Sequence, residues 1–126
     1  MGRNPFVPTR KVLSAKALDT SFNTDGEEVV QLDSVWFGMV YTTLTGTGEF
    51  KLQGGVLDQS STANSVQWFD LDADAITIDG AVSTSGNEAF NVFDVGAAEY
   101  IRVVYTKGTA SAGTVDVYVS KTTRGA

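Results

Sequence analysis

Two residue types that carry much of protein chemistry are missing from this chain of 126 residues, which has no cysteine and no histidine. Without cysteine no disulfide can form. Without thiolate and imidazole groups, the chain lacks the side chains behind most nucleophilic catalysis, general base catalysis at neutral pH, and zinc or iron binding. The composition therefore excludes most enzyme classes, and we expect a non-enzymatic protein without a cofactor.

Long apolar runs are missing as well. No run approaches the length of a membrane span, and the first residues, MGRNPFVPTRK, lack the apolar central region of a secretory signal. We therefore expect a protein that is made in a cytoplasm and has no membrane partner.

Charge is distributed unevenly along the chain. Residues 1–18 have a net charge of +4, residues 19–120 hold all 15 acidic residues and have a net charge of −12, and residues 121–126 have +2, which gives −6 in total. An acidic body repels a phosphate backbone, so we expect no nucleic-acid partner. The basic N-terminal residues have two interpretations, a solvated terminus or a segment that docks on an acidic neighbour.

Apolar residues alternate with other residues in two segments near the C-terminus. They are Ile101, Val103 and Tyr105 in the first segment, and Val115, Val117 and Val119 in the second. A period of two is typical of half-buried strands, so we predict two strands that pair as a β-hairpin. The connection between them, TKGTASAG, is rich in small residues, which favours an exposed, mobile loop that tolerates substitution.

The rest of the chain has the same organisation, with short runs separated by glycine or polar turns and no window of sustained helical period. The further predicted strands lie in residues 11–22, 27–34, 35–44, 45–55, 66–72, 75–82 and 88–95. Such a pattern indicates an all-β fold, a single antiparallel β-sandwich or jelly-roll-like barrel. Pro5 and Pro8 favour an extended N-terminal arm over residues 1–10, which leaves residues 11–126 as the sandwich domain.

Three alternate aspartates, Asp70, Asp72 and Asp74, are a weak candidate for a calcium site, because calcium binds several carboxylate oxygens. Their spacing resembles the start of an EF-hand loop. Ala75 and Ala81 stand where that loop needs glycine and a bidentate glutamate, so the motif fails. The favoured interpretation is a charged strand edge that resists aggregation, and we predict no metal.

Aromatic residues suggest a second kind of site. Trp36, Trp68, Tyr41, Tyr100, Tyr105 and Tyr118 could form a platform for a sugar or a peptide. Aromatic residues at alternate strand positions are more often part of a core or an interface, which is the favoured interpretation here.

The run GMVYTTLTGTGEFKLQGGVLDQSSTANSVQWFDL, followed by GNEAFNVFDVGAAEYIRVVYTKGTASAGTVDVYVSK, resembles the small β-sandwich proteins encoded among bacteriophage structural genes. The shared pattern covers roughly residues 38–121 and falls on Gly48 to Gln53, Trp68, Asp94 to Gly96, Tyr100 to Tyr105 and Val115 to Lys121. The chain departs from it at Val56 and Leu57, where the family pattern has a polar turn.

The resemblance implies a non-enzymatic virion structural protein, in the first place a capsid decoration (cement) protein that binds and stabilises the capsid surface. It further implies a homotrimer, and as partners the major capsid protein or neighbouring virion proteins. The residues that we expect to bind the partner are Arg3, Phe6, Val7, Arg10, Lys11 and Lys16. The alternatives are a tail or head-fibre component, a carbohydrate-binding module that uses Trp68, and a small hydrolase that uses the aspartates.

Overall fold

The computed structural model describes residues 6–29, 32–58, 65–71, 74–92 and 98–123, and these contain strands and no helix. The predicted all-β fold is therefore confirmed. The strands are β1 (Phe6–Ala17), β2 (Phe22–Asn23), β3 (Glu27–Glu28), β4 (Leu32–Leu57), β5 (Val66–Asp70), β6 (Ile76–Val92), β7 (Tyr100–Lys107) and β8 (Ala112–Thr123). In the described residues no helix is present that could cross a membrane.

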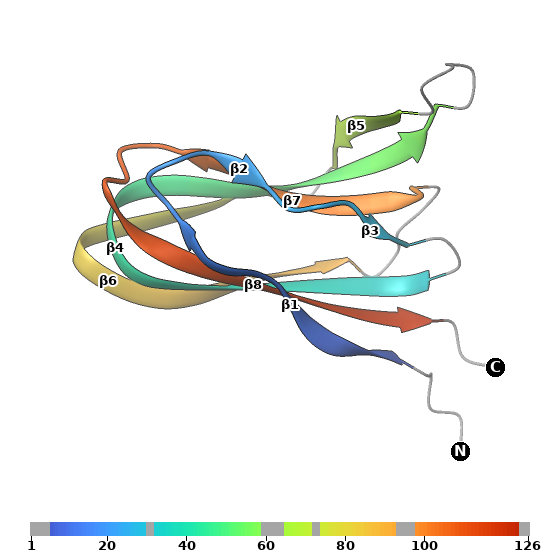
Figure 1. The fold of residues 1–126 in the computed structure, drawn as a ribbon, viewed down its shortest axis with the longest axis horizontal. Helices are drawn as coiled ribbons and strands as arrows, with labels where there is room; N and C mark the ends of the chain where they lie inside the picture. Colours follow the sequence, from blue (N-terminus) through green and yellow to red (C-terminus); the bar gives the residue numbers. More distant parts are fainter. Residues whose placement is uncertain (1–5, 30–31, 59–64, 72–73, 93–97, 124–126) are drawn as a thin grey trace.

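All the strands belong to one antiparallel sheet that curls on itself into a sandwich (Figure 1). Strand β4 lies at its centre. The first half of β4 pairs with β8, which in turn pairs with β1, and the second half pairs with β7, which in turn pairs with β2 and β3. Along its other side β4 pairs with β5 and β6. We refer to the two parts of the sheet as the β8 half and the β7 half.

The curl arises from a bend inside β4, where the sequence predicted two separate strands, residues 35–44 and 45–55. Thr43 has a φ of 55° and Gly46 a φ of 104°, and the pairing with β6 shifts register between Tyr41 and Gly46. Strand β6 bends opposite, at Ser83, which has a φ of 47°. The left-handed backbone at these positions redirects the strands without ending them, because the ladder to β6 continues on both sides.

The core lies between the two halves. Strand alternation places Phe37, Met39 and Val117 on the inner face of the β8 half, and Phe50 and Val103 on the inner face of the β7 half, and all of these are buried. The buried apolar residues of both halves form one cluster. The alternation that predicted the strands therefore also separates core from surface.

The predicted hairpin of β7 and β8 is wrong. Both strands pair with β4, and β4 lies between them in the sheet. The pairs Gly48↔Lys107 and Thr45↔Ala112 show that the chain crosses from the β7 half to the β8 half at the bend of β4. Local alternation identified the two strands, but a partner far away in the sequence determines how they pair.

The crossing segment, residues 108–111 of the predicted loop TKGTASAG, is exposed at Gly108, Thr109 and Ser111 as predicted, but hydrogen bonds attach it to β4. The backbone N–H groups of Gly108 and Ala110 donate to Thr47 O at 3.0 Å each, and Ser111 N donates to Thr45 O at 2.9 Å. Thr109 N also donates to the Thr47 hydroxyl at 3.0 Å. We refer to these hydrogen bonds between the crossing segment and β4 as the clasp, and Ala110, which takes part in it, is buried. The segment is therefore fixed to the bend of β4.

The predicted boundary between an N-terminal arm and the sandwich also needs correction. Strand β1 begins at Phe6, and Phe6, Val7 and Arg10 pair with Thr122, Lys121 and Val119 of β8. Residues 6–10 are extended as predicted, but they belong to the sheet, since they are part of β1 and three of them pair with β8. Residues 1–5 lie outside the described residues.

Candidate functional site

The predicted partner-binding residues lie on and before β1. Arg3 lies outside the described residues, and Phe6 and Val7 are described by their strand pairing alone. Arg10 and Lys16 lie opposite the buried Val119 and Val115, so both belong to the inner face of β1, whereas Lys11 lies opposite Tyr118 on the outer face. The structure thus places three of the predicted cations on one strand, but on its two faces.

The inner cations of β1 reach across to the β7 half of the sandwich. Arg10 forms an ion pair with Glu27 of β3, and the Lys16 ammonium lies 5.7 Å from the ring centroid of Phe22 in β2. These contacts join the edge of the β8 half to the edge of the β7 half.

Glu27 is the centre of an ion-pair triad that the sequence did not reveal. Besides Arg10, Lys121 Nζ of β8 contacts Glu27 Oε1 at 3.0 Å, and it also donates to Glu28 O at 3.2 Å. The side chains of Glu27 and Lys121 are only 7% and 14% exposed, whereas that of Arg10 is 53% exposed. The sequence contained one indication that Glu27 is buried, because Glu27 lies two positions before the apolar Val29 and therefore on the same face of an extended chain, and Val29 is buried.

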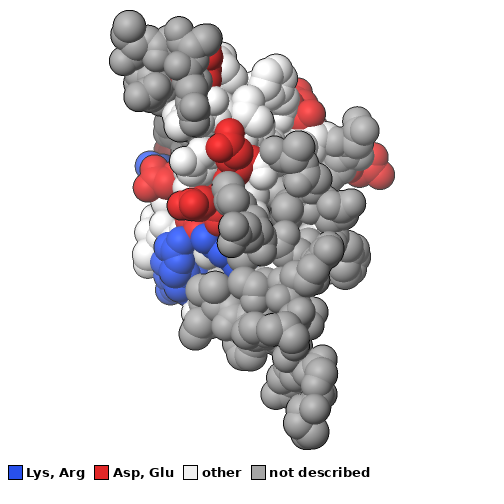
Figure 2. Space-filling model, turned by 90° about the vertical axis from the view of Figure 1, so that its right-hand side faces the viewer, with Lys and Arg blue, Asp and Glu red and all other residues white. Residues whose placement is uncertain are grey.

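Figure 2 views the side of the molecule where β1 begins and β8 ends. Lys and Arg atoms gather there in a patch that borders Asp and Glu atoms. Positive and negative charge therefore lie next to each other on this side (Figure 2). Arg10, Glu27 and Lys121 pair opposite charges in the same way.

Lys11, the outer cation, is paired with Asp116 of β8. Lys11 Nζ lies 3.4 Å from Asp116 Oδ2 and 5.5 Å from the ring centroid of Tyr118. Asp116 Oδ1 also accepts a hydrogen bond of 2.7 Å from the N–H of Ala15, which has a φ of 49° at a register shift of β1. This backbone hydrogen bond, together with Lys11, lowers the pKa of Asp116 below its usual value of 3.8.

The lowered pKa of Asp116 predicts a pH dependence. The ionised carboxylate stabilises the fold above pH 3.8, the value expected for the unfolded chain, and this contribution is lost as the pH falls through the lower pKa of the folded state. In Asp116→Asn, urea unfolding midpoints should therefore fall less steeply from about pH 5 to about pH 2 than in the unmodified protein. Lys11→Ala should flatten the slope less, because the Ala15 N–H contributes most to the shift. Identical slopes for all three proteins would contradict the assignment.

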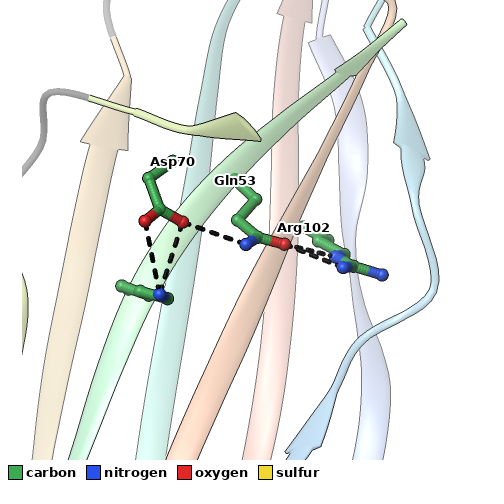
Figure 3. A network of polar contacts seen from close by, with 4 residues as sticks. Gln53, Asp70 and Arg102 are labelled. Atoms are coloured by element: carbon green, nitrogen blue, oxygen red, sulfur yellow. Dashed lines mark hydrogen bonds and ion pairs between the residues drawn. The ribbon is translucent and has the colours of Figure 1, made fainter. Parts of the chain in front are cut away.

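A polar network covers the outer face of the β7 half (Figure 3). Arg102 of β7 donates to Gln53 Oε1 from Nε at 3.0 Å and from Nη2 at 2.8 Å, and Gln53 Nε2 donates to Asp70 Oδ1 at 2.9 Å. Lys51 lies 3.3 Å from the same Asp70 oxygen. The hydrogen bond from Gln53 and the proximity of Lys51 lower the pKa of Asp70. The Arg102 guanidinium lies 4.1 Å from the ring centroid of Trp68.

The calcium hypothesis gains no support from these contacts. Asp70 is engaged by Gln53 and Lys51, Asp74 is exposed, and Asp72 lies outside the described residues. In the described part of the chain, no three carboxylates come close enough together to hold a metal ion.

The aromatic residues do not form one platform. Tyr105 is fully buried, and its hydroxyl donates to Leu18 O at 2.8 Å, which confirms the favoured interpretation of this residue as part of the core. Trp68 belongs to β5 and lies under Arg102, whereas Trp36, in the β8 half of the sheet, is 37% exposed. The two tryptophans therefore belong to different surfaces, and one of them already has a partner in the chain.

No protein-family model matches the chain, and no curated protein sequence matches it significantly. Among solved structures, a protein of the disulfide-linked pili that form Bacillus endospore appendages has a TM-score of 0.47 and 15% identity, over 97% of this chain and 91% of that chain. The coat protein of Tobacco streak virus has a TM-score of 0.40 and 12% identity, over 98% and 86% of the two chains. The CBM22-1 xylan-binding domain of Paenibacillus barcinonensis Xyn10C has a TM-score of 0.41 and 10% identity, over 100% and 99%. At this level of similarity, none of the three assigns a function to this chain.

Proposed function

We propose that the protein is a non-enzymatic structural component of a bacteriophage virion, a decoration protein that binds the capsid surface through β1. The resemblance of residues 38–121 to small phage β-sandwich proteins supports the class of protein. The observation that carries the mode of binding is the position of β1 at the edge of the sheet. It pairs with β8 on one side, and within the described ranges no strand pairs with its other side.

An open strand edge presents backbone N–H and C=O groups to which an extended segment of a neighbour can add. The side chains of Arg10 and Lys11 on this strand are 53% and 40% exposed, and Lys16 is exposed as well. Residues 19–120, by contrast, have a net charge of −12. An acidic segment of a neighbour would therefore be attracted to β1 and repelled by most of the remaining surface.

The proposed partners are the major capsid protein or neighbouring virion proteins, together with further copies of this chain in a homotrimer. Two β1 strands that met edge to edge would bring their cations together, which disfavours self-association through this edge. The trimer would therefore use another surface and leave β1 free for the capsid.

The proposal predicts that the double variant Lys11→Ala/Lys16→Ala binds empty capsids of the encoding phage about tenfold more weakly at low salt. Exposed charges are screened by salt, so the difference from the unmodified protein should shrink at high salt. Co-sedimentation with capsids measures both effects.

Two further variants make this test specific. Lys107→Ala removes an exposed cation of β7 and should bind as the unmodified protein does. Deletion of residues 1–5 removes Arg3 and leaves β1 intact, because the strand begins at Phe6. Equal binding by the double variant and by Lys107→Ala would show that β1 does not dock on the capsid.

A further inference from the structure

Both tryptophans of the chain lie against glycine, but they differ in what covers them. A side-chain carbon on Gly55 would come within 2.9 Å of the Trp68 ring, and one on Gly38 would come within 2.3 Å of the Trp36 ring. Each indole thus occupies space that any other residue would fill. Trp68 is stacked against the guanidinium of Arg102, whereas no cation of the described residues lies over Trp36.

Trp36 forms one side of a groove of about 410 Å³ on the outer face of the β8 half. Gly38 lies between Tyr118 of β8 and Ala89 of β6, and because it has no side chain, the Trp36 ring lies against it. Tyr118 and Val40 also line the groove. A volume in the range of roughly 300–1,000 Å³ is typical of small-ligand sites, so one or two rings of a ligand fit.

The side chains on this face are uncharged or already paired. Asn87 and Ala89 of β6 share the face of Trp36, because they lie opposite Val40 and Gly38. Glu88 also lines the groove, but it lies opposite the buried Met39, so strand alternation assigns it to the inner face.

Charge therefore restricts the ligand class. Asp116, which lies opposite Val40, is engaged by Lys11 and by the N–H of Ala15. A cationic ligand would need a free carboxylate on this face, and the net charge of −6 disfavours an anion. The groove matches a neutral ligand.

We propose that this groove binds a pyranose ring of a neutral oligosaccharide or polysaccharide. The apolar C–H face of such a ring packs on the exposed indole of Trp36, which is 37% exposed. Its hydroxyl groups meet the amide of Asn87 and the phenol hydroxyl of Tyr118, both of which donate and accept hydrogen bonds. The inference does not depend on the proposed role in a virion, and it places the sugar at Trp36, whereas the carbohydrate-binding alternative from the sequence used Trp68.

The test titrates linear hexamers of glucose, mannose, xylose and N-acetylglucosamine into the full chain and follows binding by calorimetry. At least one of these sugars should bind, and Trp36→Ala should weaken its binding by at least about tenfold. Trp68→Phe is the matched control and should bind as the unmodified protein does. It also leaves Trp36 as the sole tryptophan, so its emission should shift on addition of the sugar.

A second variant covers the case in which Trp36→Ala does not fold. Asn87→Ala replaces an exposed strand residue and should also weaken binding, because a hydrogen bond to the sugar is lost. The proposal is overturned if none of the four sugars binds at about 10 mM, or if binding persists in both Trp36→Ala and Asn87→Ala. It is also overturned if an arginine-rich peptide binds the groove more tightly than every sugar, since the ligand would then be a protein cation.

Discussion

Replacement of Gly46 by alanine is expected to lower the free energy of unfolding by about 4 kcal/mol. The residue has a φ of 104°, which L-residues with a side chain rarely adopt. Its new methyl group would lie 2.5 Å from Thr109 O and 2.7 Å from the Ala110 Cα. Both are backbone atoms of the crossing segment, which the hydrogen bonds to Thr45 and Thr47 fix to β4, so neither can move alone. Urea unfolding followed by tryptophan fluorescence measures the loss.

Gly86→Ala is the matched control for this variant. Its methyl group would meet the Tyr41 hydroxyl at 2.6 Å, which is the far end of a half-buried side chain that can rotate away. Its φ carries no left-handed strain. We expect it to change the free energy of unfolding by less than about 1 kcal/mol. If both variants lose the same stability, the clasp at the bend of β4 is not what makes Gly46 necessary.

Removal of the Glu27 side chain is expected to lower the free energy of unfolding by about 3 kcal/mol. In Glu27→Ala the ammonium of Lys121, which is only 14% exposed, keeps its hydrogen bond to Glu28 O but loses its counter-charge. The variant also removes the ion pairs that link β3 to β1 and β8, because the Glu27 carboxylate bridges the two halves of the sandwich. Chemical denaturation at neutral pH measures the effect.

The double variant Glu27→Ala/Lys121→Ala distinguishes two causes of this destabilisation, an unpaired Lys121 ammonium and a general loss of side-chain packing. It removes the unpaired ammonium as well, so it should be more stable than Glu27→Ala alone. Asp70→Ala, which breaks the exposed ion pair with Lys51, should have a much smaller effect than Glu27→Ala. A Glu27→Ala protein as stable as Asp70→Ala would show that the triad does not hold the halves together.

The fold was predictable from alternation as far as the positions of the strands, but not their pairing. Residues 100–105 and 115–119 are strands as predicted, yet the hydrogen bonds of Ala110 and Ser111 go to the distant bend of β4. Long-range hydrogen bonds of this kind leave no trace in a local pattern. The bend of β4 could not be predicted either, because a glycine such as Gly46 is equally compatible with a turn between two strands and with a bend inside one strand.

The candidate site was predictable only in part, for the same reason. Charge distribution identified Arg10, Lys11 and Lys16 as a group, and all three lie on β1. Their partners come from other strands. The position of Glu27 two residues before Val29 indicated its burial only weakly, because β3 is two residues long. Which tryptophan is exposed depended on Arg102, whose approach to Trp68 requires the full sheet order.

The order of strands in the sheet also determines when the chain can fold during synthesis. Strands β1 and β4 leave the ribosome before β8, but each of them pairs with β8, which is made after β2 to β7. Val115, Val117 and Val119 belong to the strand that lies between β1 and the first part of β4 in the sheet. Until this strand emerges, β1 has no strand to pair with, and the first part of β4 lacks one of its two neighbours. Such distant pairings slow folding and leave apolar strands exposed to other nascent chains. A ribosome that stalls before β8 therefore releases a chain that can close the β7 half of the sandwich but not the β8 half.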